Sequence, residues 1–222
     1  MRPARNVEAF MRAPLARYVV APRFVFWCRD ATLRGAALWG RLSVGDVEQL
    51  IRIMEDERFM QKPWDVVQDV RRLESFDSDA VARYLAWAQT RLAEERKKVR
   101  RRAIVYGAGI PALVVTGFYS LFGLPANWRI FNEPREAFLW LERPDAEALF
   151  EEVEEVIARA MGAQAPEIGP LRAYLAGHLA AASVEDVATA LGMSVRSLQR
   201  ALGVAGTTFR DEVVWARIEE AK

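Results

Sequence analysis

The sequence predicts a mixed α/β domain with a mostly parallel sheet and covering helices, followed by a small all-α domain. Over residues 18–160, apolar runs rich in valine and aromatic residues alternate with segments whose apolar residues recur every three or four positions. Such alternation requires crossover connections, which place parallel strands side by side. After residue 169 the strand signal ends and only short helices are predicted. With 222 residues, 52% of them hydrophobic, the chain is long enough for both cores.

A hairpin and a capped helix come first in this domain. Residues 24–29 and 33–42 are apolar runs, and the short polar link 30–32 makes them a plausible pair of antiparallel strands. Ser43, followed three residues later by Asp46, forms a capping box that predicts a helix start. The apolar face of that helix consists of Val44, Val47, Ile51 and Met54.

Strands and helices then alternate to the end of the domain. Further strands are expected at 64–70, 102–106 and 128–131. Helices are expected from Asp77 or Ser78 onward, at 111–122, at 134–141 and at 145–160. The strands are apolar almost throughout, as expected for strands buried on both faces. The basic run 97–102 is interpreted as a solvated helix end, with a second DNA-backbone patch as the alternative.

One segment resembles a membrane span. Residues 103–128 carry no charge and follow the basic run, which is the pattern of a transmembrane helix. Glycines and prolines at both ends of the segment favour a buried strand followed by a buried helix instead. The N-terminus has no signal-peptide core, and the single cysteine, Cys28, permits no internal disulfide. We therefore expect a cytoplasmic protein with no membrane partner.

The domain boundary is predicted at residues 163–169, a short stretch of small residues with one proline. This linker would separate an α/β domain at 1–162 from a helical domain at 170–222. In the helical part, Ala188, Gly192 and Leu198 have the spacing of a helix-turn-helix. That motif needs a small residue where two helices approach, a left-handed turn residue, and an apolar residue on the inner face of the second helix.

These residues also resemble a known family. The segment 191–202, with the following Gly-Thr-Thr-Phe and Val213, is similar to the first helix-turn-helix of AraC/XylS-type regulators. The resemblance implies that residues on the outer face of the second helix read bases, which here are Arg196, Gln199 and Arg200. Arginine can pair with guanine and glutamine with adenine. The candidates for phosphate contacts are Ser194, Ser197, Thr207 and Thr208.

The resemblance covers half of the family's DNA-binding region. AraC/XylS-type regulators carry two such subdomains joined by a long helix, whereas this chain ends where that helix would lie. From residue 170 onward, six Lys and Arg residues are balanced by six Asp and Glu residues. A neutral unit makes few phosphate contacts, so we expect weak DNA binding unless the protein dimerises or the second half is present.

The order of elements in the first domain is similar to that of STAS-like (anti-sigma-factor-antagonist) domains. The resemblance implies that the domain senses a small-molecule or protein signal, dimerises, or docks a partner protein. Some STAS-like domains are switched by phosphorylation of a serine after the third strand, and Ser75 and Ser78 lie in that region. A serine at this place also serves as an ordinary helix cap.

An enzyme is not predicted. Cys28 lies on an apolar strand, which favours a buried small hydrophobe over a nucleophile. With His178 as the only histidine, neither a metal site nor a catalytic triad can be assembled, and no cofactor is expected. Asp65 and Asp69 could form an acid pair, although strand ends often carry such residues. The tryptophans that could line a pocket or a dimer face instead of the core are Trp39, Trp87 and Trp140.

The sequence therefore predicts a transcriptional regulator that binds double-stranded DNA through its C-terminal domain and senses or dimerises through its N-terminal domain. The alternative is a protein-interaction module in which the STAS-like domain docks a signalling partner. In that case the helical unit would serve only as a contact surface. The motif spacing favours the first hypothesis, and the balanced charge of the helical unit favours the second.

Overall fold

The computed structural model describes residues 1–107, 125–178, 182–205 and 207–220. Its internal contacts divide the chain into two units, Met1–Ile157 and Ala158–Lys222, and each is described by itself. The expected helix at 111–122, and with it most of the uncharged segment 103–128, lies outside the described residues. Within the described ranges, none of the helices has both the length and the apolar character needed to cross a bilayer.

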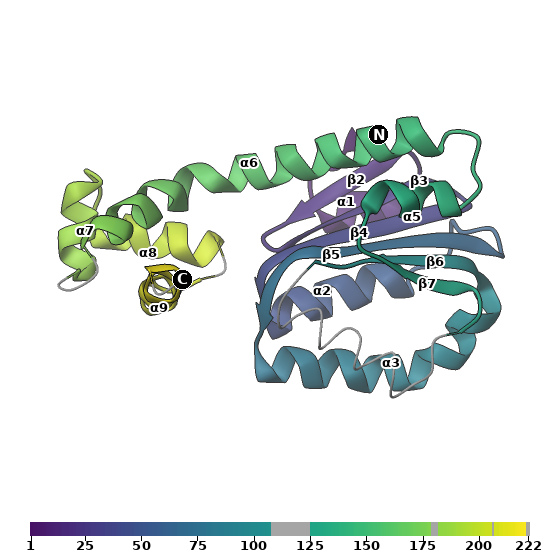
Figure 1. Cartoon of the computed structure of the whole chain (residues 1–222), viewed down its shortest axis with the longest axis horizontal. Coiled ribbons are helices and arrows are strands. Elements are labelled where there is room, and N and C mark those ends of the chain that lie inside the picture. Colours follow the sequence, from purple (N-terminus) through teal and green to yellow (C-terminus); the bar gives the residue numbers. More distant parts are fainter. Residues whose placement is uncertain (108–124, 179–181, 206, 221–222) are drawn as a thin grey trace. The chain divides into compact units, whose positions relative to one another are not determined.

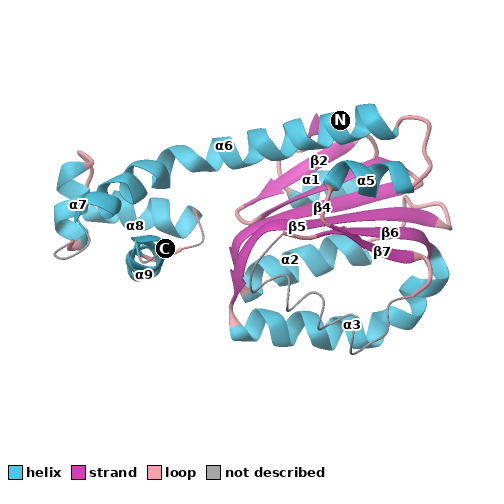
Figure 2. Cartoon of the chain, in the orientation of Figure 1, coloured by secondary structure: helices cyan, strands magenta, loops and turns pink. Residues whose placement is uncertain are grey.

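The first unit is built on a seven-stranded sheet whose strands lie side by side in chain order (Figures 1 and 2). The strands are β1 (Arg2–Pro3), β2 (Arg17–Ala21), β3 (Phe24–Asp30), β4 (Leu33–Leu42), β5 (Trp64–Phe76), β6 (Val99–Val105) and β7 (Trp128–Phe131). The pairs β2–β3 and β3–β4 are antiparallel, and the other four pairs are parallel. The expected mixed α/β class with a mostly parallel sheet is confirmed.

Helices cover both faces of this sheet. The helices of the unit are α1 (Val7–Arg12), α2 (Val44–Glu55), α3 (Ser78–Lys98), α5 (Pro134–Trp140) and the first part of α6 (Ala146–His178). The α2 and α3 helices lie on one face, whereas α5 and α6 lie on the other (Figure 1). The predicted hairpin is present as β3 and β4, and the capping box of Ser43 and Asp46 begins α2 as predicted.

Large aromatic side chains fill the core on both faces of β3. Phe26 packs against Phe10 of α1 on one face, and Trp27 stacks on Phe138 of α5 on the other. The ring of Trp27 lies directly over Gly35 of β4. A Cβ atom at Gly35 would stand 2.3 Å from the Trp27 ring, so this position requires glycine. The sequence pattern alone did not predict this close contact at Gly35.

The structure differs from the sequence prediction at three places in this unit. Strand β1, helix α1 and strand β2 precede the predicted hairpin, and β2 adds a third antiparallel strand. Strand β5 continues to Phe76 instead of ending at residue 70, because its second half pairs with β4 alone. Strand β6 begins at Val99, so the basic run spans the end of α3 and the start of β6.

The expected linker at 163–169 is helical. Helix α6 is continuous from Ala146 to His178 and includes Pro166 and Pro170. Proline lacks a backbone donor and disfavours a helix interior, which is why the sequence predicted a break there. The surrounding alanine, glutamine and glutamate residues are strong helix formers, and the helix continues through the segment. The division between the units falls within α6, after Ile157.

The second unit consists of the end of α6 with α7 (Val184–Ala190), α8 (Val195–Val204) and α9 (Phe209–Glu220). These are the four short helices predicted from residue 170 onward, the first of them joined to α6. They enclose one apolar cluster. Its buried members are Ile168, Leu171, Leu175, Val187, Ala188, Leu198, Leu202, Ala205 and Ala216.

Candidate nucleic-acid interface

The turn between α7 and α8 has the geometry that the sequence spacing predicts. Ala188 is 2% exposed and Leu198 is fully buried, so both face the core of the unit. Gly192 lies between the helices with a φ of +66°, in the left-handed region. A Cβ atom at Gly192 would meet nothing within 4 Å, so backbone conformation alone requires glycine there. The backbone N–H of Met193 donates to the Ala188 carbonyl at 2.9 Å and closes the turn.

Helix α8 presents polar side chains on the face opposite its buried leucine. Arg196 and Gln199 are both exposed, and they lie three residues apart on one side of the helix. Neither side chain forms a hydrogen bond or an ion pair within the part of the chain that the structure describes. The backbone of Arg200 belongs to α8, but its side chain lies outside the described ones. Two of the three predicted base-reading side chains therefore have their polar groups available to an external partner.

Two of the four residues predicted to contact phosphates, Ser194 and Thr208, cap helices with their hydroxyl groups. Ser194 begins α8, where its hydroxyl accepts a hydrogen bond from the Ser197 amide at 3.1 Å and lies 2.9 Å from the Ser197 hydroxyl. Thr208 accepts from the Asp211 amide at 3.2 Å and donates to the Asp211 carboxylate at 2.8 Å. A phosphate at Thr208 would meet this carboxylate, which opposes the predicted contact. Thr207 is half-buried, and its backbone amide donates to Leu202.

Among the described cations of the C-terminal segment, Arg172 forms an ion pair within the unit. The Arg172 guanidinium lies 2.7 Å from the carboxylate of Glu212, which is 3% exposed, and it stacks over the ring of Trp215. This pair connects the end of α6 to α9. Among the described side chains, Arg196, Arg210 and Arg217 are the exposed cations of this segment. Few cations are therefore available for phosphate contacts, as the charge balance predicts.

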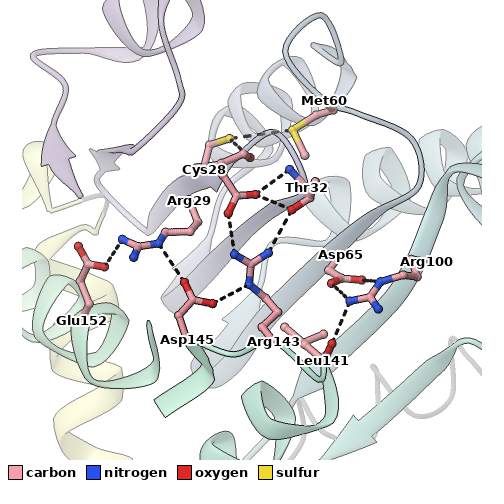
Figure 3. Close-up of polar contacts among 11 residues, drawn as sticks. Cys28, Arg29, Thr32, Met60, Asp65, Arg100, Leu141, Arg143, Asp145 and Glu152 are labelled. Atoms are coloured by element: carbon pink, nitrogen blue, oxygen red, sulfur yellow. Dashed lines mark hydrogen bonds and ion pairs between the residues drawn. The ribbon is translucent and has the colours of Figure 1, made fainter. Parts of the chain in front are cut away.

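The most extensive polar cluster of Figure 3 lies in the first unit, at the amino ends of the parallel strands. Arg143 contacts Asp30 at 2.6 Å and Asp145 at 3.0 Å, and it donates to the Thr32 hydroxyl at 3.1 Å. Burial raises the pKa of Asp30, but hydrogen bonds from Thr32 and Arg143 and the charge of Arg143 outweigh it. The net pKa therefore lies below its ordinary value. The cluster fixes the loop before α6 to the sheet.

The two aspartates considered as an acid pair have separate partners. Asp65 accepts from the Arg100 Nε at 2.9 Å (Figure 3). Asp69 lies 2.7 Å from Arg71, on the same strand. Each carboxylate is thus paired with an arginine, so the acid-pair alternative is not supported by the geometry.

Most of the basic run also pairs internally. Lys98 lies 2.8 Å from Glu57, and Arg102 forms an ion pair with the buried Glu95. Arg34 lies 3.7 Å from the same glutamate and donates to the Met54 carbonyl. The interpretation of the run as a solvated helix end is therefore wrong for these residues. Arg102 is buried because the run continues from α3 into strand β6, whereas Lys98 is the last residue of α3.

Cys28 is a buried thiol in surroundings that disfavour the reactive thiolate. It is 2% exposed, and its Sγ donates to the Asp30 carbonyl at 3.2 Å. Burial raises its pKa to about 12, so the thiol stays protonated at neutral pH. The prediction of a buried small hydrophobe is confirmed for this residue. His178 stacks on Tyr174 at the exposed end of α6, and within the described ranges no group of histidine, cysteine or carboxylate side chains has the geometry of a metal site.

The remaining candidate residues are the three tryptophans proposed for a pocket or dimer face and the two serines proposed for phosphorylation. Trp39 and Trp87 are buried in the core, so they do not form an exposed dimer face. Trp140 is half-buried and stacks on Phe131. Ser75 and Ser78 are exposed near the start of α3. Aspartates flank Ser78 on both sides, and they would repel a phosphate added to it.

Comparison with solved structures finds a protein of similar fold. No family model matches the chain, and no curated protein matches it. The chain is similar to the crystal structure of an uncharacterised protein of the DUF3478 family, with a SpoIIAA-like fold, from Shewanella loihica PV-4. The identity is 20% and the TM-score 0.41, and the match covers 54% of this chain and 94% of the other.

Proposed function

We propose that this protein is a sequence-reading DNA-binding regulator whose helix α8 enters the major groove. The observation that carries the proposal is the two-sided character of α8. Leu198 is fully buried against the unit, while Arg196 and Gln199 extend outward without partners among the described side chains. A recognition helix needs this arrangement, because its inner face holds the motif together while its outer face meets base edges.

The chemistry of the outer face supports base reading. Arginine donates two parallel hydrogen bonds to guanine, and glutamine both donates to and accepts from adenine. The left-handed turn at Gly192 sets the direction in which α8 leaves α7. Because this unit offers few cations, we propose that the first unit supplies dimerisation, so that two copies of α8 contact two half-sites. The AraC/XylS resemblance of the sequence is part of the same proposal.

Paired affinity measurements on the full chain test the base-reading role. The affinity for a duplex selected from a random pool and for a scrambled duplex is compared for wild type, Arg196→Ala, Gln199→Ala and Arg200→Ala. Loss of a base contact should reduce specific affinity by about tenfold, since a bidentate contact contributes about 1 to 3 kcal/mol of discrimination. Arg217→Ala on α9 is the charge-matched control. An equal loss on both duplexes would overturn the base-reading role.

A second candidate function is protein docking through α9, with a second copy of this chain as the partner. Val214 and Ile218 are 47% and 54% exposed, and they lie four residues apart on one side of that helix. Exposed apolar residues with this spacing suit a helix that packs against a partner. If the chain enriches no DNA sequence from a random pool, while Val214→Ser with Ile218→Ser abolishes self-association, this second function would replace the first.

A further inference from the structure

A groove of about 490 Å³ lies in the first unit, between the edge of the sheet and the end of α1. Three separate segments provide its basic lining: Arg2 from β1, Arg12 from the last turn of α1, and Arg17 from the start of β2. The apolar part of the lining includes Leu15 and Phe59. Neither the sequence patterns nor the DNA-binding proposal uses this groove. Its volume is within the range of small-molecule sites in proteins.

The three arginines have no carboxylate partner within the described part of the chain. The Arg17 guanidinium donates a long hydrogen bond of 3.4 Å to the Ala13 carbonyl, and neither Arg2 nor Arg12 forms an ion pair there. The nearby carboxylates are engaged elsewhere. Glu8 lies 3.3 Å from Arg52, and Asp56 lies 2.6 Å from Arg58. The arginines of Figure 3, in contrast, are paired with aspartates and glutamates. Because its three arginines lack such partners among the described residues, the groove carries a local excess of positive charge.

The backbone holds the basic side chains in place. Arg2 and Arg17 are direct neighbours in the parallel pair β1–β2, so their Cα atoms are fixed side by side. Ala16 between the segments has a φ of 57°, a left-handed conformation that L-residues rarely adopt. Its carbonyl accepts from the Arg2 amide at 2.9 Å, and its amide donates to the Arg29 carbonyl at 3.2 Å. The backbones of Arg2 and Arg17 are therefore held side by side, and Arg12 lies in the last turn of α1.

The groove also has an apolar wall. Leu15 is 43% exposed, and Phe59 is half-buried with the Arg58 guanidinium 5.7 Å from its ring centre. A ligand that fits both features carries a compact anionic group and a small apolar body. Guanidinium groups bind phosphate oxygens through paired hydrogen bonds. A phosphate monoester carries a charge of about −1.5 to −2 at pH 7, which offsets three arginines better than a single carboxylate does.

We propose that this groove binds a small soluble phosphate monoester with an apolar or aromatic group. The phosphate lies among Arg2, Arg12 and Arg17, and the apolar group contacts Leu15 and Phe59. The inference stands apart from DNA reading, because all of these residues belong to the first unit. It would remain valid if the helical unit bound no DNA.

Calorimetric titration of the full chain with phenyl phosphate tests the proposal. We expect saturable binding with one site per chain, weaker binding of inorganic phosphate, and none of benzyl alcohol, which lacks the anion. Arg12→Gln and Arg17→Gln should each weaken binding by about tenfold, the usual loss for a charge-assisted hydrogen bond. Arg129→Gln, at an exposed arginine on β7 outside the groove, is the matched control and should leave the affinity unchanged.

Four results would overturn the proposal. The first is no binding of phenyl phosphate. The second is an affinity that Arg12→Gln leaves unchanged while its circular dichroism spectrum matches that of wild type. The third is that the protein sediments with phosphatidic acid vesicles but does not bind phenyl phosphate, which would assign the groove to a lipid headgroup. Equal losses in Arg12→Gln and Arg129→Gln would equally contradict it, because they would indicate nonspecific attraction to net charge.

Discussion

Replacement of Gly192 by alanine tests the left-handed turn on which the orientation of α8 depends. The φ of +66° costs an L-residue about 1 to 2 kcal/mol, whereas alanine restricts the unfolded chain and returns about 0.4 to 1 kcal/mol. No atom lies within 4 Å of the added methyl group, so no steric clash contributes. We therefore expect Gly192→Ala to destabilise the second unit by about 1 kcal/mol.

A second glycine of the same unit provides a control of opposite sign. Gly203 lies in the last turn of α8, and an added methyl group there also meets nothing within 4 Å. Because its backbone is helical, Gly203→Ala should stabilise the unit by up to about 1 kcal/mol. The same chemical change at two uncrowded sites is thus predicted to have opposite effects.

Hydrogen exchange measured by mass spectrometry on peptides from α7 and α8 reports both changes. A loss of 1 kcal/mol corresponds to about fivefold faster exchange of protected amides. Gly192→Ala should accelerate exchange by this factor, and Gly203→Ala should slow it. Exchange at the wild-type rate or slower in Gly192→Ala would show that this position is not left-handed, and the assigned turn geometry would be wrong.

Three further predictions concern Cys28, Arg172 and Asp30. At pH 8 the raised pKa of about 12 should make Cys28 react with 4,4′-dithiodipyridine about a thousandfold more slowly than an ordinary thiol of pKa 9.0. Fast reaction in the folded chain would contradict the burial of Cys28. The contribution of the protonated thiol to stability is full below pH 9 and is lost as the pH rises toward 12. Arg172→Met should destabilise the second unit by about 2 to 4 kcal/mol, because Glu212 stays buried without its cation, and Arg172→Met with Glu212→Gln should recover part of this loss in urea titrations. The lowered pKa of Asp30 gives stability that is present above pH 3.8 and lost as the pH falls through the lowered value. Arg143→Gln should therefore lower stability at pH 7 by about 1 kcal/mol, given the partial exposure of Asp30, and should flatten the decline below pH 4 in acid titrations.

Local patterns were sufficient to predict the elements with strong periodicity. The hairpin at 24–29 and 33–42 and the capping box at Ser43 are present because short-range apolar spacing and side-chain capping fix them. The spacing of Ala188 and Leu198 likewise predicted their burial. By contrast, β1 has two residues and α1 has six, which is too short for a periodic signal.

The charged contacts could not be predicted from local sequence. Asp30 and Arg143 are 113 residues apart in the chain, and they meet only because β3 and the loop before α6 lie at the same end of the sheet. The same reason applies to the basic groove, whose arginines come from β1, α1 and β2, and the β1–β2 pairing places Arg2 beside Arg17. The predicted linker at 163–169 was wrong. The prediction gave more weight to the proline in this segment than to the strong helix formers around it, and α6 continues through the segment.

The central claim is that α8 reads DNA sequence, and selection from a randomised duplex pool followed by sequencing tests it most directly. The selection is carried out with the full chain, with Arg196→Ala and Gln199→Ala, and with Arg217→Ala as the control. We expect wild type and Arg217→Ala to enrich one common motif, and each α8 variant to lose preference at the base that its side chain contacts. Absence of any enriched motif, or an unchanged motif in both α8 variants, would contradict the claim.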